Sequence, residues 1–228
     1  MNDRPYVLLS CATSVDGYID DTSPERLRLS NEADFDRVDE ARAGVDAILV
    51  GATTIRRDNP SLLVRSPERR AARAARGMPE NLTKVTLTTL GELDPQARFF
   101  TTGTEPKIVY TGARAAGELR AELDGVAEVV ALGAGVAIPA LLADLHARGV
   151  RRLMVEGGGG VHTAFLTADL VDEIQLAVAP FFVGDPDAPR FTHPGAFPQN
   201  PARPMRLAET RAIGDVAFLR YLVGADDG

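Results

Sequence analysis

The sequence predicts an α/β fold built on a mixed, mostly parallel β-sheet flanked by helices. Short apolar segments rich in Val, Leu and Ile recur along the chain, and segments with helical spacing of apolar residues separate them. The last two strand segments are separated only by Gly214-Asp215, which predicts a C-terminal antiparallel hairpin. No internal repeat or low-complexity linker divides the 228 residues, so we expect a single domain over residues 1–228.

The first fifty residues show this alternation. Tyr6 to Thr13 is an apolar run typical of a strand that is buried on both faces. Ser30 is suited to cap a helix whose apolar side chains follow at near-helical spacing from Phe35 to Val45. Asp46 to Gly51 has the pattern of the next buried strand. A strand, a helix and a strand in this order predict a parallel pair joined by a right-handed crossover.

The rest of the chain continues the pattern. Further strands are expected over residues 84–89, 107–111, 127–132, 152–155, 172–179, 205–210 and 216–223. Helices are expected over residues 113–123, 138–148 and about 161–168. Residues 65–80 are rich in Arg and Ala and are expected to form a surface helix or loop, with the arginines on a solvated face. Residues 194–204 contain four prolines and are expected to be irregular.

Composition excludes several classes of function. A formal net charge of −7 argues against general nucleic-acid binding, which needs cations to replace counterions. The lone cysteine, Cys11, fits a reducing compartment and is interpreted as a packed core residue. Met1 to Pro5 shows no apolar signal region, and no apolar run reaches membrane-spanning length. From these features we expect a cytoplasmic protein. The three histidines lack metal-ligand spacing, so we expect no metal site.

Ligands of open α/β sheets bind beyond the carboxyl ends of the strands, and a glycine run lies at one such end. Glu156 is followed by four glycines, Gly157 to Gly160, between a strand and a helix. Glycines let the backbone approach a phosphate, and the helix offers free N–H groups to it. The run therefore favours a phosphate site over a plain strand-to-helix turn. The spacing is not that of a Rossmann fingerprint.

Two other segments follow strand ends. In residues 51–62, the hydroxyl groups and Asp58 suit a ribose or an amide, and Arg65 beyond them suits a phosphate. A polar turn closed by Pro60 is an equally good interpretation of this segment. Residues 13–17 alone predict only a turn. His162, in the first turn after the glycines, either touches a cofactor or is a solvated helix residue.

Five sequence blocks occur together in one order and spacing. They are Thr13-Ser14-Val15-Asp16-Gly17, Asp46 to Gly51, Asp58-Asn59-Pro60-Ser61-Leu62 with Arg65, Val155-Glu156-Gly157-Gly158, and Leu170-Val171-Asp172-Glu173 with Ala179-Pro180. They span about 170 of the 228 residues. In this combination the chain resembles the pyrimidine reductases of riboflavin biosynthesis.

The resemblance implies a dihydrofolate-reductase-like fold, a homodimer and NADPH as the cofactor. It also implies a reaction, in which the ribosylamino group of a phosphorylated aminopyrimidine is reduced to the ribitylamino product. The substrate would be 5-amino-6-(5-phosphoribosylamino)uracil or its 2,5-diamino precursor. Hydride would come from NADPH, and the proton from Asp58, Glu156 or water.

The resemblance further implies roles for individual residues. Those expected to contact the cofactor are Thr13 near the nicotinamide, Thr54, Asp58, Thr89 and the loop Gly158, Gly159, Gly160, Val161 and His162 up to Ala164. Those expected to contact the substrate are Arg42, Leu62, Arg65 and Glu156, with the two arginines on the side of the 5′-phosphate.

The sequence departs from the family pattern at several positions. Tyr18 stands where many members carry Lys or Arg, Asn59 stands where Asp is usual, and there is no Trp. These changes bear on the substrate more than on the cofactor. Two alternatives therefore stay open: a reductase of another pterin- or folate-like substrate, and a non-catalytic nucleotide-binding protein. The zinc deaminase domain of bifunctional relatives needs a cysteine pair, so with one cysteine we expect no deaminase activity.

Overall fold

The computed structural model describes residues 3–224, so Met1 and Asn2 of the N-terminal segment considered above lie outside it. Contacts group the chain into two compact units. The first consists mainly of Asp39–Met154, and the second of Tyr6–Val38 together with the chain that follows Met154. This grouping describes contacts within the fold, and the single domain remains a prediction.

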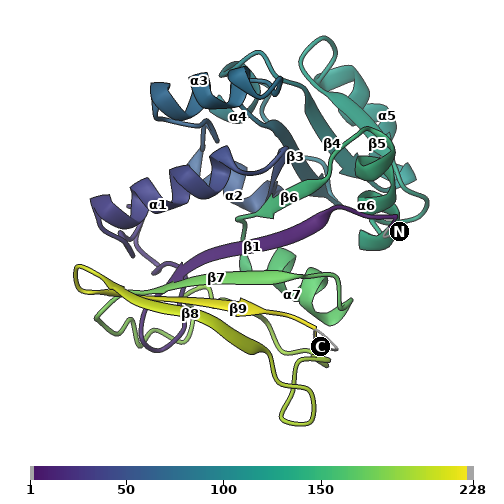
Figure 1. The fold of residues 1–228 in the computed structure, drawn as a ribbon. Coiled ribbons are helices and arrows are strands. Elements are labelled where there is room, and N and C mark those ends of the chain that lie inside the picture. Colours follow the sequence, from purple (N-terminus) through teal and green to yellow (C-terminus); the bar gives the residue numbers. More distant parts are fainter. Residues whose placement is uncertain (1–2, 225–228) are drawn as a thin grey trace. The chain divides into compact units, whose positions relative to one another are not determined.

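The first unit contains five strands in the order β5-β4-β3-β2-β6. Their bounds are β2 Ala47–Gly51, β3 Thr83–Thr88, β4 Lys107–Thr111, β5 Glu128–Ala131 and β6 Arg152–Val155 (Figure 1). β2, β3, β4 and β5 pair in parallel, as the sequence predicted. The whole of β2 is buried, which accounts for its continuous apolar sequence. The predicted bounds of β4 and β6 are confirmed, β2 begins one residue later than predicted, and β3 and β5 differ by one residue at both ends.

Five helices belong to this unit. They are α2 Ala52–Asp58, α3 Pro67–Ala75, α4 Arg98–Thr101, α5 Ala113–Glu122 and α6 Ile138–Ala147. The predicted apolar stripe of α6 is buried. The sequence did not predict α2, which starts directly after β2, or α4, which has only four residues.

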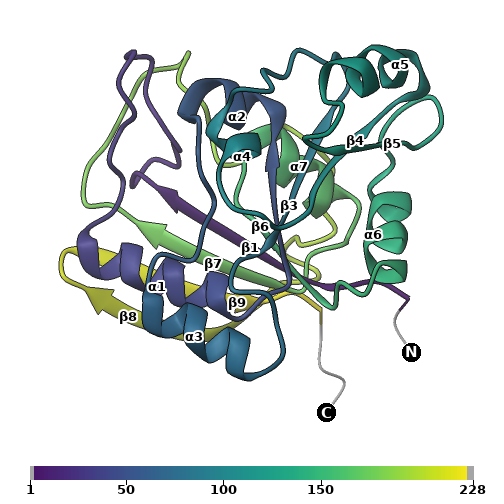
Figure 2. The same cartoon turned by 90° about the horizontal axis from the view of Figure 1, so that it is seen from above.

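The second unit contains β1 Tyr6–Thr13, β7 Glu173–Val178, β8 Arg206–Ile213 and β9 Val216–Leu222, in the order β1-β7-β9-β8. β1 and β7 pair in parallel, whereas β9 is antiparallel to both β7 and β8. The predicted C-terminal hairpin is therefore confirmed, and it lies beside β7 in both ribbon views (Figures 1 and 2). α7 Gly159–Thr167 belongs to this unit, and α1 Glu32–Ala43 belongs to it up to Val38.

Three predictions about this architecture are wrong. β1 and β2 are not directly paired, because the neighbours of β2 are β3 and β6. Ser30 does not cap α1, since the side chain of Asn31 accepts the N–H of Asp34 at 3.0 Å and Ser30 donates to the Asp34 carboxylate instead. The arginines of residues 65–80 do not share a solvated face, because Arg73 is fully buried.

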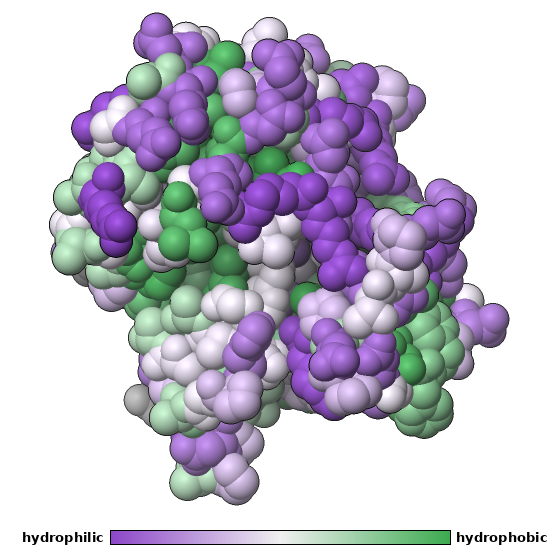
Figure 3. Space-filling view, turned by 180° about the vertical axis from the view of Figure 1, so that it is seen from behind, coloured by the Kyte–Doolittle hydropathy of each residue, from purple (hydrophilic) through white to green (hydrophobic). Residues whose placement is uncertain are grey.

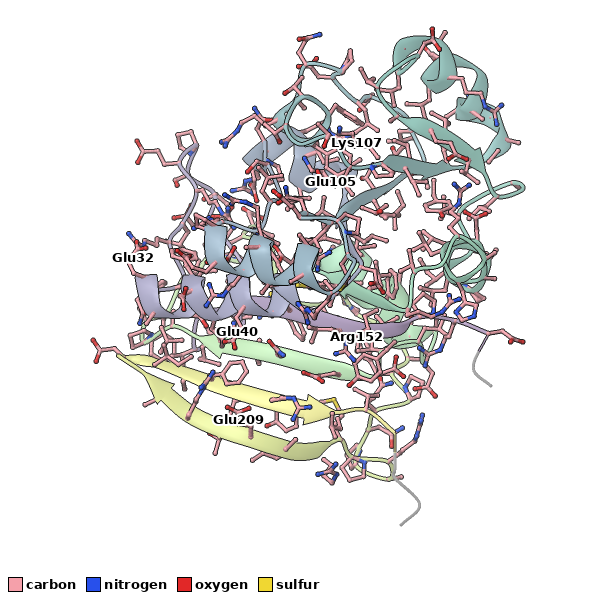
Figure 4. All side chains as sticks on the ribbon, turned by 45° about the horizontal axis from the view of Figure 1, so that its top comes forward. Glu32, Glu40, Glu105, Lys107, Arg152 and Glu209 are labelled. Carbon is pink, nitrogen blue, oxygen red and sulfur yellow. The ribbon has the colours of Figure 1, made fainter. Side chains whose placement is uncertain are left out.

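The surface carries the charge that the composition implies. Hydrophilic side chains predominate on the face shown in Figure 3, and hydrophobic side chains form smaller patches between them. Figure 4 labels acidic side chains on α1, Glu32 and Glu40, and Glu209 on β8. No helix within residues 3–224 is long and apolar enough to cross a membrane. The cytoplasmic location remains a prediction.

Candidate active site

The glycine run forms the N-terminus of α7 in the second unit. Gly158 has φ 68° and ψ 143°, a backbone conformation that favours glycine, and no side chain caps the helix. No described residue accepts the N–H groups of Gly159, Gly160 or Val161. A Cβ on Gly160 would meet nothing within 4 Å. An anion approaching Gly160 would therefore meet open space, free N–H donors and the positive end of the helix dipole.

At Gly159, unlike Gly160, there is no room for a side chain. A Cβ at Gly159 would lie 2.4 Å from the carbonyl oxygen of Arg190 and 2.9 Å from the ring of His193. The absence of a side chain at this position is therefore required by the packing of residues 190–193 against the loop. The sequence could not separate this role from phosphate binding, because all four residues of the run are glycine.

His162 is completely buried, so its interpretation as a solvated helix residue is wrong. Its Nδ1 lies 2.9 Å from the carbonyl oxygen of Phe191, an acceptor, so Nδ1 carries the proton. Burial lowers the pKa of His162 to about 4, and the bond to Phe191 only partly opposes this shift. The imidazole is therefore neutral at pH 7, and its Nε2 is a buried acceptor with no hydrogen-bond partner among residues 3–224.

Thr13 and Glu156 belong to the same unit as the glycine run. Thr13 ends β1, is 4% exposed and accepts the N–H of Ala179 at 2.7 Å. Two residues earlier on the same face of β1, burial raises the pKa of the Cys11 thiol to about 12, and the nearby charge of Glu156 adds to the rise. The half-buried Cys11 thiol is therefore protonated and unreactive, and the charge of Glu156 acts on it.

In the first unit, Thr54 and Thr89 lie just beyond the carboxyl ends of two neighbouring strands, β2 and β3. Thr54 is in the first turn of α2, directly after β2, and Thr89 follows β3. Gly51 of β2 is paired with Leu87 of β3, so the carboxyl ends of these two parallel strands meet at that edge. The hydroxyl of neighbouring Thr88 bonds both the N–H and the carbonyl of Gly91, which fixes the loop and leaves Thr89 exposed.

The block from Asp58 to Leu62 contains two residues in the left-handed region. Asn59 ends α2 with φ 42°, and its side-chain oxygen accepts the N–H of Arg98 at 2.6 Å. Leu62 has φ 51° although its side chain is almost fully buried. A bulky residue with this φ is strained and persists only where its surroundings determine the conformation. The conformation of the block is therefore determined by its surroundings, and both the ligand-binding and the polar-turn interpretation remain predictions.

Arg42 lies in the last turn of α1, and the backbone of Arg65 is bonded to another residue of the same helix. Nη1 of Arg42 donates to the carbonyl of Leu63 at 3.4 Å. One turn earlier on α1, the Asp39 carboxylate accepts the N–H groups of Arg65 and Ser66. Asp39 thus holds the backbone of Arg65 at a point one helical turn from Arg42, and the side chain of Arg65 is exposed.

Sequence reasoning missed Asp39, which shapes this segment. Asp39 is 3% exposed and also pairs with Arg69 at 3.0 Å. Burial alone would raise the pKa of its carboxyl, but the hydrogen bonds from Arg65, Ser66 and Arg69 outweigh burial and hold the pKa below its usual value. An acidic residue inside a helix carries no signal of such a role, because its partners lie 26 to 30 residues away.

The chain matches the family model described as the RibD C-terminal domain over residues 5–219. It is 40% identical over 188 residues to the 2,5-diamino-6-ribosylamino-4(3H)-pyrimidinone 5′-phosphate reductase of Archaeoglobus fulgidus, an alignment that covers 82% of this chain and 85% of the relative. Two further relatives with the same name are 37% and 35% identical.

Solved structures agree on the fold. A pyrimidine reductase-like protein from Corynebacterium diphtheriae superposes with a TM-score of 0.79 at 22% identity, covering 97% of this chain and 93% of that chain. The bifunctional deaminase/reductase of Thermotoga maritima superposes with a TM-score of 0.73 at 23% identity, and this chain spans 57% of its length. The chain therefore belongs to the RibD C-terminal domain family, the pyrimidine-reductase family that its sequence blocks resemble.

Proposed function

We propose that this chain reduces 2,5-diamino-6-ribosylamino-4(3H)-pyrimidinone 5′-phosphate to its ribitylamino product with NADPH. The observation that carries the proposal is the 40% identity, over most of both chains, to a reductase of that name. The sequence left the diamino and the deaminated substrate open, and the names of the three relatives favour the diamino compound. A substrate of the folate type has no comparable support.

A reductase of this family implies a nicotinamide cofactor, and residues of the second unit suit one. Free N–H groups and open space at Gly160 suit a dinucleotide phosphate. The unpaired Nε2 of buried His162 adds an acceptor in the first turn of the same helix. When bound, the nicotinamide supplies the hydride. That the cofactor is NADPH, and that Thr13, Gly158 to His162, Thr54, Asp58 and Thr89 contact it, is proposed from the resemblance.

Reduction of the opened ribosylamine also consumes a proton. Glu156 remains a candidate donor, since it lies between the end of β6 and the glycine loop and its charge acts on the Cys11 thiol of β1. Asp58, the last residue of α2 in the first unit, remains the other protein candidate. If Glu156 is the donor, Glu156→Gln loses turnover while NADPH binding is retained. If Asp58 is the donor, Asp58→Asn loses turnover even at saturating NADPH, the concentration needed because Asp58 is also a proposed cofactor contact. Water remains the third candidate source of the proton.

The proposed function is tested with the full chain, NADPH and the diamino substrate, with oxidation of NADPH as the readout. The deaminated pyrimidine and dihydrofolate are the competing substrates. We expect the largest kcat/KM with the diamino compound. Tight NADPH binding with no turnover on any of the three would identify a non-catalytic nucleotide-binding protein. A larger kcat/KM with dihydrofolate would identify a folate-type reductase.

Removing either proposed phosphate arginine should affect only phosphorylated substrate. A charged hydrogen bond contributes about 1.5–3 kcal/mol, so we expect Arg42→Ala and Arg65→Ala each to raise KM roughly ten- to hundredfold. With the dephosphorylated analogue the KM should hardly change. Arg69→Ala is the matched control, because Arg69 supports the same segment through Asp39 and should affect both substrates alike. Equal losses on both substrates for Arg42→Ala and Arg65→Ala would make these residues structural.

We also propose a homodimer that forms through the hairpin. Paired residues of β7, β9 and β8 share a sheet face, and Ile174, Tyr221 and Leu207 form one such row. Leu207 is 48% exposed although it is apolar. We expect light scattering at micromolar concentration to give twice the chain mass and Leu207→Glu to shift it toward the chain mass. Asp215→Lys at the hairpin turn is the control, and a monomeric wild-type chain would contradict the proposal.

A further inference from the structure

Arg190 lies on the ring of Tyr18 in the second unit. Its guanidinium carbon is 4.2 Å from the ring centroid, Nη2 donates to the Tyr18 hydroxyl at 2.5 Å, and Nη1 donates to the carbonyl of Asp16 at 3.4 Å. Tyr18 is only 3% exposed, and a single antiparallel bridge joins its backbone to that of Arg190. A buried ring with a stacked and hydrogen-bonded guanidinium fixes the orientation of the cation.

The charge of Arg190 is not neutralised by any described carboxylate. Its partners are a hydroxyl and a backbone carbonyl. The carboxylate of Asp16 faces other groups: it accepts the hydroxyl of Ser14 and the N–H groups of Val183 and Gly184. Two of the five guanidinium N–H groups of Arg190 are used, so three remain for a ligand. An exposed arginine with free donors and no carboxylate partner is suited to bind an anion.

The main chain at Arg190 is fastened to the first turn of α7. The carbonyl oxygen of Arg190 lies 2.4 Å from the position that a Cβ on Gly159 would take. The next carbonyl, that of Phe191, accepts Nδ1–H of His162 at 2.9 Å, and the N–H of His193 donates to Thr163 at 2.8 Å. These successive contacts make residues 190–193 and the glycine loop one rigid element. The unpaired Nε2 of His162 belongs to the same element.

We propose that Arg190 is a phosphate-binding residue of this enzyme and that Tyr18 positions it. The ligand class is a phosphate ester, which the guanidinium would bind through its free N–H groups at a site preorganised by the Tyr18 ring and the α7 contacts. The proposal rests on the proposed function, because that function supplies two phosphate-bearing ligands, the dinucleotide cofactor and the substrate monoester.

The experiment compares the full wild-type chain with Arg190→Gln and Arg203→Gln. Arg203 is the matched control, since it is an exposed arginine of the same unit whose charge is neutralised by Asp169 at 2.6 Å. NADPH binding is titrated without substrate. The KM is then measured with the phosphorylated and the dephosphorylated substrate. We expect Arg190→Gln to weaken one phosphate-bearing ligand about tenfold or more, and Arg203→Gln to weaken none.

The NADPH titration and the KM measurements together identify which ligand carries the phosphate that Arg190 binds. A change in NADPH affinity assigns Arg190 to the cofactor, and a change in KM confined to the phosphorylated substrate assigns it to the substrate. Unchanged binding of both ligands, or equal weakening by Arg203→Gln, would overturn the proposal. If the chain reduces no aminopyrimidine at all, a loss of NADPH affinity in Arg190→Gln still supports the site while the proposed function fails, and an unchanged NADPH affinity overturns both.

Two further variants separate positioning from folding. Arg190→Lys retains the charge and should recover part of the lost affinity, even if Arg190→Gln folds poorly. Tyr18→Phe retains the ring and removes the hydroxyl that holds Nη2, so it should weaken the same ligand as Arg190→Gln but less strongly. The positioning role of Tyr18 is wrong if Tyr18→Phe leaves the affinity of that ligand unchanged.

Discussion

Gly159→Ala is expected to destabilise the protein, and Gly160→Ala is expected to leave its stability intact. The new Cβ at position 159 would lie 2.4 Å from a backbone oxygen, that of Arg190, which cannot rotate away. Over-packing of this kind costs roughly 1–3 kcal/mol, and in a chain of this size each kcal/mol lowers the melting temperature by about 2–4 °C. At position 160 the new Cβ meets no protein atom, and alanine favours a helix.

Binding of NADPH should separate the same two variants in another way. Gly160→Ala fills the space through which a phosphate would approach the free N–H groups, so we expect it to lower NADPH affinity in a protein of wild-type stability. Gly117→Ala, on α5 and also free of neighbours within 4 Å, is the control for both measurements. Unchanged NADPH affinity in Gly160→Ala would remove the glycine loop from the cofactor site.

The glycine run illustrates how far the sequence could predict the site. Its place between a strand and a helix was readable, because a buried apolar run precedes it and a helical pattern follows. The separate requirements at Gly158, Gly159 and Gly160 were not readable. They depend on a backbone angle, on the contact with Arg190 and on open space, and none of these is encoded by local residue type.

The elements were predictable where burial was continuous or periodic. β1, β4 and β6 have the predicted bounds, since proline, glycine or polar residues flank these strands on both sides. α2 escaped prediction because only Ala52 and Ile55 of its seven residues are buried, which is too short a pattern to show a helical period. The four residues of α4 show no period at all. Local pattern thus determined the buried strands and the longer helices, and the short helices depend on tertiary contacts.

Buried polar residues were the main failure of sequence reasoning. His162 and Arg73 are polar side chains on helices, for which a solvated position is the ordinary expectation. Phe191, the acceptor of His162, is 29 residues away, and two of the four acceptors of Arg73, Ala43 and Val45, are 30 and 28 residues away. The free energy that keeps such groups buried comes from hydrogen bonds to distant backbone carbonyls, so it leaves no trace in the neighbouring sequence.

The buried Arg73 leads to the second large expected effect. Its guanidinium is fully buried and donates to four backbone carbonyls, those of Ala43, Val45, Pro79 and Asn81, at 2.7 to 3.2 Å. Ala43 is the last residue of α1, where carbonyls lack helical partners, and the other three acceptors lie in the segments that lead into β2 and β3. One side chain therefore satisfies acceptors from two separate segments of the first unit, residues 43–45 and residues 79–81.

Arg73→Met should lower the free energy of unfolding by about 3 kcal/mol or more. Methionine fills a similar volume but donates no hydrogen bond, and each buried acceptor left unsatisfied costs about 1–3 kcal/mol, partly offset because no charge has to be desolvated. Arg76→Met, one turn later, is the matched control: this exposed side chain donates only to Ala72 and, at 3.4 Å, to Ala43, so its loss should change stability by less than about 0.5 kcal/mol. Chemical denaturation of both variants measures the difference. If Arg73→Met unfolds at the same denaturant concentration as Arg76→Met, the four carbonyls find other donors and Arg73 does not hold these segments together.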